Sequence, residues 1–374
     1  MRILFLLLLS FPIWAACPTG YNYRYPITIA HTSIDGTGTL SNFTIRFAGT
    51  YTALADSPTG RVLTGNDICF TNSAGTQLPH VLRSRNTSTG ATEGRVKVDT
   101  INADTSDTVI YLYLGNAGQA SSEENAAALY DSSHVVVLEM GDGTTLSTAD
   151  SSVNGLDFTN SGASAVAGPA SGLGAAQFTA GEQDYMQRAS NAAFDVSAWT
   201  VEGWFQVTGT STFTAPFANR YPGNGTAGQW MFARAVATSN PMYLDIPWVA
   251  GAVVTGSTNL SNSTWYHVAL TKSSNTYTVY LNGASDGSAT NASAPVNSGP
   301  MTLGAFPRTD LGAASWHYLT GRISNYRFSN VARAQNYIKA TRDSFLDPST
   351  FYSVGTEEFV GTGTQRRRPI MLFP

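Results

Sequence analysis

The stretch WTVEGWFQV at residues 199–207 decides the fold of this chain. Trp199, Val201 and Phe205 share one face, and the residues between them share the other, which is the period-two pattern of a β-strand. Aromatic residues occur on both faces. This is expected of a strand whose sheet packs against a second sheet on one side and forms a surface on the other. The stretch therefore predicts a strand of a β-sandwich.

Alternating segments of the same kind extend in both directions from this stretch. Those from residue 21 to 114 are short, among them YRYPITIA, FTIRFAG and TVIYLYLG, and those from residue 131 to 358 are longer and more aromatic, among them QWMFARAV and TWYHVALTKS. Turn residues separate them, and one short helix is expected in ARAQNYIKATRD. We predict an all-β chain with an N-terminal antiparallel β-sandwich over residues 17–118, a linker over 119–130, a larger β-sandwich over 131–358 and a disordered tail over 359–374.

The N-terminus has the features of a secretory signal peptide. Arg2 supplies a positive charge, and the apolar run from residue 3 to 14 is too short to span a bilayer comfortably. Ala15 and Ala16 are small residues suited to cleavage. We therefore expect residues 1–16 to be removed and the protein to be secreted or held at the cell surface. No later stretch is apolar enough for a transmembrane segment.

Charge and cysteine content narrow the partners and the compartment. Charged residues make up 12% of the 374 residues, the formal net charge is −4, and the basic run at residues 366–368 is expected to be a solvated tail, so no nucleic-acid partner is predicted. The two cysteines, Cys17 and Cys69, are expected to form a disulfide in an oxidising compartment. The alternative is that Cys17 is a lipidated N-terminal cysteine, although Trp14 stands where lipoprotein signals usually have an aliphatic residue.

Two known families resemble the two halves. YNYRYPITI, NDICFTNSAGTQLPHVL and TVIYLYLGNA resemble a bacterial domain of unknown function (DUF2341) that precedes laminin-G-like modules in secreted proteins. AAQFTAGEQDYMQ, WTVEGWFQV, STWYHVALTKSSNTYTVYLNG and GRISNYRFSNVARAQNYI resemble the laminin-G/concanavalin-A-like jelly rolls. The second resemblance implies two curved antiparallel sheets packed face to face, so we expect a concanavalin-A-like jelly-roll β-sandwich.

Some jelly rolls of this superfamily are glycoside hydrolases, which need two carboxylates across the scissile bond. The laminarinase-like branch carries Glu-x-Asp-x-x-Glu on one strand, and the corresponding residues here are Glu182, Asp184 and Gln187. A glutamine cannot exchange the catalytic proton. The five histidines have no metal-binding spacing, and no nucleophile elbow or phosphate loop occurs. We therefore expect no enzymatic activity.

The resemblance also implies a calcium ion, since laminin-G-like domains often hold Ca²⁺ through aspartates and loop carbonyls. The loop DSSVNGLD matches the acidic loop of the family and offers Asp150, Asn154 and Asp157 as ligands. However, Ser324-Asn325 stand where the family often has an acidic pair. A plain turn built by Asp and Asn is the alternative.

Aromatic residues near strand ends are the remaining candidates for ligand binding, because exposed rings stack on sugars and anchor protein interfaces. They are Trp230, Tyr243, Trp248, Trp316 and His317. The alternative for each is a place in the core. The leading hypothesis is a non-catalytic recognition or adhesion protein that binds a glycan or an extracellular protein. A structural spacer of a surface or virion assembly and a degenerate glycoside hydrolase are the alternatives.

Overall fold

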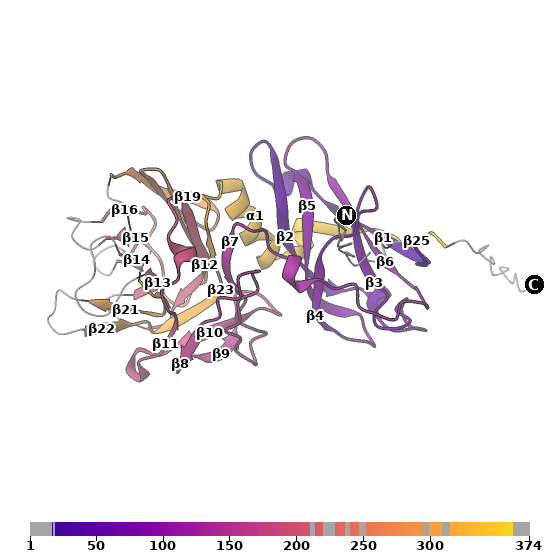
Figure 1. Cartoon of the computed structure of the whole chain (residues 1–374), viewed down its shortest axis with the longest axis horizontal. Helices are drawn as coiled ribbons and strands as arrows, with labels where there is room; N and C mark the ends of the chain where they lie inside the picture. The colour runs from indigo at the N-terminus through magenta and orange to yellow at the C-terminus, as the bar shows by residue number, and fades with distance from the viewer. Residues whose placement is uncertain are drawn as a thin grey trace, which may run out of the picture.

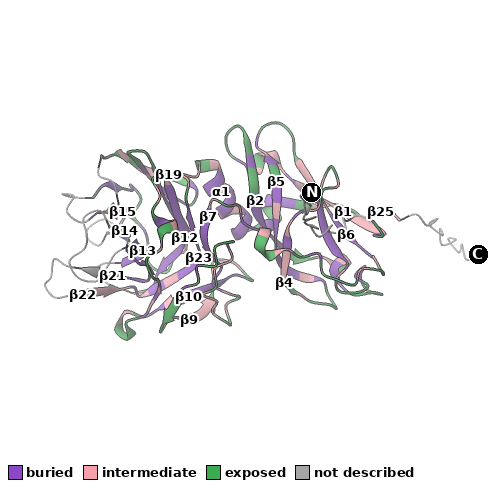
Figure 2. Cartoon of the chain, viewed as in Figure 1, coloured by how far each residue is buried: buried purple, intermediate pink, exposed green. Residues whose placement is uncertain are grey.

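The computed structural model describes residue 17 and residues 19–209, 214–219, 229–235, 240–246, 252–292, 295, 299–308 and 315–361. Antiparallel strands form two β-sandwiches side by side, with the N-terminal one on the right in Figure 1. Buried residues run along the strands of both sandwiches, whereas many residues of the described loops are exposed (Figure 2). The predicted all-β fold is thus confirmed. No helix among these residues is long and apolar enough to cross a membrane.

The N-terminal sandwich packs two sheets face to face. One sheet has the order β24 (Tyr352–Val354), β1 (Tyr23–Ile29), β6 (Thr108–Leu114), β3 (Ile68–Asn72), with β25 (Glu358–Phe359) also on β1. The other has the order β2 (Thr39–Thr50), β5 (Ala91–Asn102), β4 (His80–Arg85). Alternate residues such as Phe43, Ile45 and Phe47 fill the core between them. The short 3₁₀ helices η1 (His31–Ser33), η2 (Thr52–Leu54) and η3 (Ala126–Ala128) lie in the connections.

The second sandwich is the jelly roll. One sheet has the order β19 (Ala284–Thr290), β18 (Thr276–Leu281), β17 (Tyr266–Ser273), β12 (Trp199–Val207), β23 (Gly321–Ser329), β10 (Gly174–Phe178), β9 (Ser164–Ala167), with β7 (His134–Leu138) also on β23. The other has the order β16 (Val254–Thr255), β15 (Met242–Asp245), β14 (Trp230–Arg234), β13 (Thr214–Asn219), β20 (Met301–Leu303), β11 (Tyr185–Arg188), β8 (Thr159–Ser161). The hairpin of β21 (Ala305–Arg308) and β22 (Ser315–Tyr318) and the 3₁₀ helices η4 (Ala180–Glu182) and η5 (Ala192–Phe194) complete it.

The C-terminal segment returns to the N-terminal sandwich. Helices α1 (Gln335–Leu346) and α2 (Pro348–Phe351) follow the jelly roll, and α1 lies between the two sandwiches in Figure 1. The rings of Tyr337 and Phe351 pack against Phe43, at centroid distances of 5.0 and 6.4 Å. Strands β24 and β25 then pair with β1. The structure therefore differs from the predicted domain limits, which assigned residues up to 358 to the jelly roll.

Buried ion pairs join the two sandwiches. Glu139, which follows β7 of the jelly roll, lies 2.8 Å from Arg83 and 2.6 Å from Arg95 of the N-terminal sandwich. Arg95 also contacts Glu93 at 2.5 Å, and Glu93 contacts Arg46 at 2.8 Å. Each charge that is buried here has an opposite charge beside it, as burial of ions requires.

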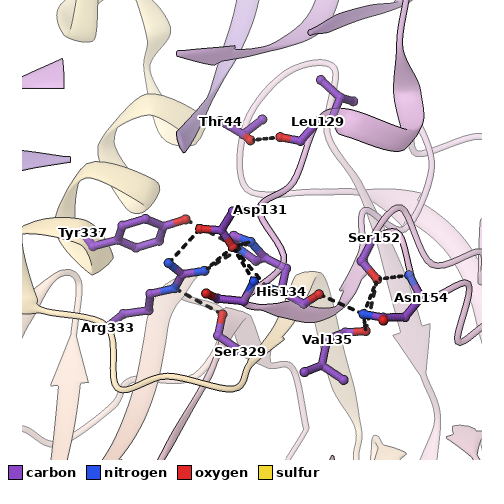
Figure 3. A network of polar contacts seen from close by, with 11 residues as sticks. Thr44, Leu129, Asp131, His134, Val135, Ser152, Asn154, Ser329, Arg333 and Tyr337 are labelled. Carbon is purple, nitrogen blue, oxygen red and sulfur yellow. Dashed lines mark hydrogen bonds and ion pairs between the residues drawn. The ribbon is translucent and has the colours of Figure 1, made fainter. Parts of the chain in front are cut away.

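A second polar network holds the segment between the sandwiches to helix α1 (Figure 3). The Arg333 guanidinium donates two hydrogen bonds to the Asp131 carboxylate, at 3.0 and 2.8 Å, and His134 Nδ1 lies 2.9 Å from the same carboxylate. Tyr337 Oη lies 3.4 Å from His134 Nε2. Burial, followed by the nearby Arg333, lowers the pKa of His134 to about 4, so the ring is neutral at physiological pH.

The predicted disulfide is present. Cys17 and Cys69 are bonded, with their Cα atoms 6.4 Å apart, and they pack with Tyr21 and Tyr113. This pairing favours the disulfide over the lipidated alternative for Cys17. The predicted signal peptide and most of the predicted tail lie outside the described residues.

Candidate functional site

Trp316, one of the aromatic residues predicted to bind a ligand, is partly exposed and lies beside two other partly exposed aromatic side chains. Trp316 and Tyr318 are two residues apart on β22 and therefore share one face of the strand, and Tyr185 at the start of β11 lies beside them. The Trp316 ring centroid lies 5.5 Å from that of Tyr185 and 6.1 Å from that of Tyr318, with interplanar angles of 27° and 17°. All three side chains are partly exposed. We call Tyr185, Trp316 and Tyr318 the aromatic surface.

Polar residues border the aromatic surface. Helix η4 lies against β22 and carries the exposed Glu182, and the exposed Gln183 follows it in a left-handed conformation with φ of 62°. Burial, and to a smaller extent the neighbouring Tyr185, raises the pKa of Tyr318. The phenol is therefore neutral at physiological pH and can both donate and accept a hydrogen bond. Apolar rings with polar groups at their rim can bind a sugar ring by stacking and by hydrogen bonds to its hydroxyls.

The other side of the same hairpin packs on the jelly roll. Phe306 of β21 stacks on His317 at a centroid distance of 5.2 Å, and Phe306 belongs to a buried cluster with Met231 on the outer face of β14. Tyr243 packs half-buried against that cluster. The structure thus brings Trp316, His317 and Tyr243 into one region. His317 lies on the side of the hairpin that faces the sheet, and Tyr243 of β15 lies on the sheet beneath it.

The position of Trp230 differs from the prediction that this residue binds a ligand. Its side chain has 0% exposure and stacks on Trp199 with ring centroids 5.0 Å apart, in the core between the two sheets. The residues of β14 alternate between the core and the outer face, and Trp230 falls on the core side. We therefore withdraw Trp230 as a ligand-binding residue. Trp248 lies outside the described residues.

The carboxylate of Asp150 is fully used by the protein's own donors. It accepts the Val137 and Ser152 backbone N–H groups at 2.9 and 2.8 Å, the Ser152 hydroxyl at 2.7 Å and the Leu156 N–H at 2.8 Å. A carboxylate has about four lone-pair sites, so little capacity remains for a cation. The donors also explain why an aspartate is needed at this turn.

The other two predicted calcium ligands also make hydrogen bonds in this region. Asn154 Nδ2 donates to the carbonyl oxygens of His134 and Val135, both at 3.1 Å (Figure 3), and Asp157 accepts the Asp150 N–H at 2.8 Å. Within the described parts of the chain, no group of three or more His, Cys, Asp or Glu side chains could hold a metal ion. The hydrogen bonds of Asp150 therefore favour the alternative, a plain turn built by Asp and Asn, over a calcium site.

The residues that resemble a glycosidase motif do not form a carboxylate pair. Glu182 is exposed on η4, and the left-handed Gln183 interrupts the extended chain before Asp184. Asp184 is buried, and its carboxylate accepts the Thr179 N–H at 2.9 Å. Because one carboxylate faces solvent and the other is used inside the fold, they cannot act together across a glycosidic bond.

A buried acid and a buried imidazole lie beneath α1. Glu202 of β12 and His267 of β17 are 1% and 2% exposed, and their Oε2 and Nε2 atoms are 3.5 Å apart. Burial raises the pKa of Glu202, whereas burial, followed by Arg327 and Arg342, lowers that of His267 to about 3. Burial therefore favours the uncharged form of both side chains, and the His267 imidazole is neutral at physiological pH. Such shifts often mark active sites, but a substrate cannot reach these enclosed side chains.

Sequence reasoning did not find two members of the aromatic surface. Tyr318 could have been found, because the alternation in SWHY places it on the same side of a strand as Trp316. Tyr185 carries no such signal, since it is distant in sequence and reaches Trp316 only through the fold of the jelly roll. The partner of a ring across a fold cannot be inferred from local periodicity.

Comparisons with known proteins agree with this architecture. Residues 180–339 match the concanavalin A-like lectin/glucanases superfamily, and residues 64–148 match a domain of unknown function, DUF2341. No curated protein sequence matches the chain.

Solved structures with a similar fold include three sugar- or receptor-related proteins of low sequence identity. Domain 4 of AbnA, a GH43 extracellular arabinanase from Geobacillus stearothermophilus solved with arabinotriose, has a TM-score of 0.43 and 14% identity, over 56% of this chain and 98% of that domain. The binding domain of Paraclostridial Mosquitocidal Protein 1 has a TM-score of 0.43 and 14% identity, over 57% of this chain and 52% of that one. The receptor binding domain of botulinum neurotoxin D has a TM-score of 0.41 and 11% identity, over 57% and 53%.

This chain therefore spans about half the length of the last two proteins and nearly all of the first. The family matches follow the order that the sequence predicted. A segment that matches DUF2341 is thus followed by a segment that matches the concanavalin A-like lectin/glucanases superfamily.

Proposed function

We propose that this protein is an extracellular, non-catalytic recognition protein whose jelly roll binds a glycan on the aromatic surface. The observation that carries the proposal is the group of near-parallel, partly exposed rings of Tyr185, Trp316 and Tyr318. Core aromatics are enclosed, as Trp230 is, whereas these three side chains are partly exposed beside polar groups. Stacked rings of this kind contribute to binding beyond the apolar area that they bury.

The remaining parts of the proposal have separate support. An extracellular location is supported by the signal-like N-terminus and by the Cys17–Cys69 disulfide, since disulfides persist in oxidising compartments. A non-catalytic role is supported by the separation of Glu182 from Asp184 described above. Membership of a lectin/glucanase superfamily is compatible with sugar binding, although a fold alone does not specify a function.

A glycan array followed by titration calorimetry tests the proposal. Glycans that bind the mature chain should lose at least tenfold in affinity with the double variant Trp316→Ala, Tyr318→Ala, because both partly exposed rings are removed. Tyr111→Ala is the matched control, since this half-buried tyrosine packs under Arg24 on the other sandwich, and its affinity should stay within twofold of the wild type. The bound glycan should be recovered intact.

Two results would contradict the proposal. One is a glycan affinity that is unchanged in the double variant, which would place binding elsewhere. The other is the absence of binding to any glycan on the array, which would favour the structural-spacer alternative.

A further inference from the structure

A cleft opens on the N-terminal sandwich, and most of its residues are far in sequence from those of the aromatic surface. It has a volume of about 440 Å³, and it lies between η2, the edge strand β24 and the residues of β1 and β6 that face the core. Tyr25, Leu112 and Tyr352 form its buried part. Its volume falls within the range of small-ligand sites, roughly 300–1,000 Å³.

The accessible part of the cleft is uncharged and rich in hydroxyl groups. The exposed Thr52, Ser349 and Ser353 and the half-buried Tyr51 line it. Of the described residues that line the cleft, none carries a charge, and most carry a hydroxyl. A site for a phosphate, a carboxylate or an ammonium group would be expected to place an opposite charge in its lining. The lining therefore selects against charged ligands.

The aromatic walls of the cleft are fixed by their own hydroxyls. The hydroxyls of Tyr51 and Tyr352 are 2.9 Å apart, and both contact the backbone of Ala48, at 3.0 Å in each case. The Tyr25 hydroxyl donates to Glu357, whose carboxylate is paired with Arg61 at 2.7 Å. These rings are thus held in place before a ligand arrives, which reduces the entropy lost on binding.

The edge strand adds backbone hydrogen-bonding groups. Strand β24 pairs with β1 on one side and ends its sheet on the other. The Gly355 N–H donates to the Pro26 carbonyl oxygen at 2.8 Å. Because bonded and non-bonded pairs alternate in an antiparallel ladder, the N–H and C=O of the preceding residue, Val354, point away from β1. A ligand in the cleft can therefore find both a donor and an acceptor there.

From these observations we infer that the cleft is a ligand site of the N-terminal sandwich that binds a neutral sugar residue. A sugar ring has apolar C–H faces, which suit the tyrosine and leucine walls, and hydroxyls, which suit the hydroxyl-bearing residues and the free edge of β24. Neither the residues nor the domain are those of the aromatic surface, so this site is independent of the proposed function of the jelly roll.

Calorimetry on full-length mature protein carrying Trp316→Ala tests the inference without a contribution from the aromatic surface. The probes are cellohexaose, xylohexaose and mannohexaose, with hexagalacturonate as the charged counterpart. At least one neutral hexasaccharide should bind, and hexagalacturonate should bind at least tenfold more weakly. Adding Tyr51→Ala should weaken the neutral ligand at least tenfold, because it removes one wall. Tyr51→Phe should stay within threefold, because the ring remains and its hydroxyl bonds only to the protein.

A further variant tests the cleft without changing a ring that packs in it, in case Tyr51→Ala does not fold. Thr52→Arg changes an exposed residue of η2 and places a long charged side chain at the cleft, so it should also weaken the neutral ligand. Binding that survives both Tyr51→Ala and Thr52→Arg would overturn the inference, as would equal affinity for hexagalacturonate. Loss of all binding in Trp316→Ala would overturn it while leaving the proposed function intact. Full affinity in Trp316→Ala with loss in Tyr51→Ala is the result expected of a cleft that binds independently of the aromatic surface.

Discussion

Replacing Glu139 by glutamine tests how strongly the two sandwiches are joined. The side chain of Glu139 is fully buried at the junction, where it contacts Arg83 and Arg95 of the other sandwich and accepts the Tyr130 hydroxyl at 2.6 Å. Glutamine has nearly the same shape but no charge. The substitution therefore leaves the packing in place and removes one of the two carboxylate charges beside the buried Arg95.

The pKa of Glu139 gives the magnitude. Burial alone would raise this pKa, but Arg83 and Arg95, followed by the Tyr130 hydroxyl and Arg327, lower it from 4.5 to about 2. At 1.36 kcal/mol per pKa unit, the charged form contributes about 3 kcal/mol to the free energy of unfolding at pH 7. Because the folded pKa is the lower one, this contribution is complete above the unfolded value of 4.5 and is lost as the pH falls through about 2. About 1 kcal/mol should remain at pH 3.

Urea unfolding of wild type and Glu139→Gln at pH 7 and pH 3, followed by tryptophan fluorescence, measures both values. Glu358→Gln is the control, because the Arg24–Glu358 pair is on the surface with side chains 32% and 42% exposed. Surface pairs contribute at most about 1 kcal/mol, so this control should change little at either pH. A loss in Glu139→Gln that equals the control at pH 7, or that is the same at both pH values, would refute the reasoning.

Three further substitutions test other parts of the structure. Burial raises the pKa of Glu202 above 4.5, so the wild type loses stability as the pH rises above that value. In urea unfolding, Glu202→Gln should therefore be more stable than the wild type at pH 7 and no more stable than it at pH 4. Asp150→Ala should lower the melting temperature equally in millimolar calcium and in chelator, because the Asp150 carboxylate accepts hydrogen bonds from backbone N–H groups. A lower melting temperature seen only in calcium would instead support a calcium site at this loop. Cys17→Ala should cost about 4 kcal/mol in urea unfolding, because the disulfide closes a loop with a sequence separation of 52; an unchanged midpoint would contradict this.

The sequence was sufficient for the fold class and for the order of the two domains, because period-two alternation is local and the family motifs are spread along each half. It did not reveal that β24 and β25 join the N-terminal sandwich or that α1 packs against both sandwiches. Strand β24 has only three residues, too few for an alternation pattern, and its partner β1 lies more than three hundred residues earlier in the chain. Pairing over such a separation depends on the complete jelly roll between the two strands.

The candidate site shows the same limit at the level of single residues. Trp230 and Trp316 both occur near strand ends in aromatic segments, so the sequence treats them alike. The structure separates them: Trp230 faces the opposite sheet and is covered by Trp199, whereas Trp316 lies on the outer side of a hairpin beside Tyr185. Which face of a strand is exposed depends on the second sheet, which local sequence does not specify. Glu182, Asp184 and Gln187, by contrast, were judged non-catalytic from chemistry alone, and the geometry supports that prediction.

The return of the chain to β1 connects the two proposed binding sites within one structure. Strand β24 closes the cleft of the N-terminal sandwich, and the same C-terminal segment is tied to the junction through Arg333 and Asp131. With the buried Glu139 pairs, these contacts keep the cleft and the aromatic surface at a fixed separation. Two linked sites gain avidity when the ligand spans both, and lose it when the geometry does not match. The protein should therefore hold an extended or repeating glycan more tightly than a short oligosaccharide, and weakening the junction with Glu139→Gln should reduce the affinity for the long ligand alone.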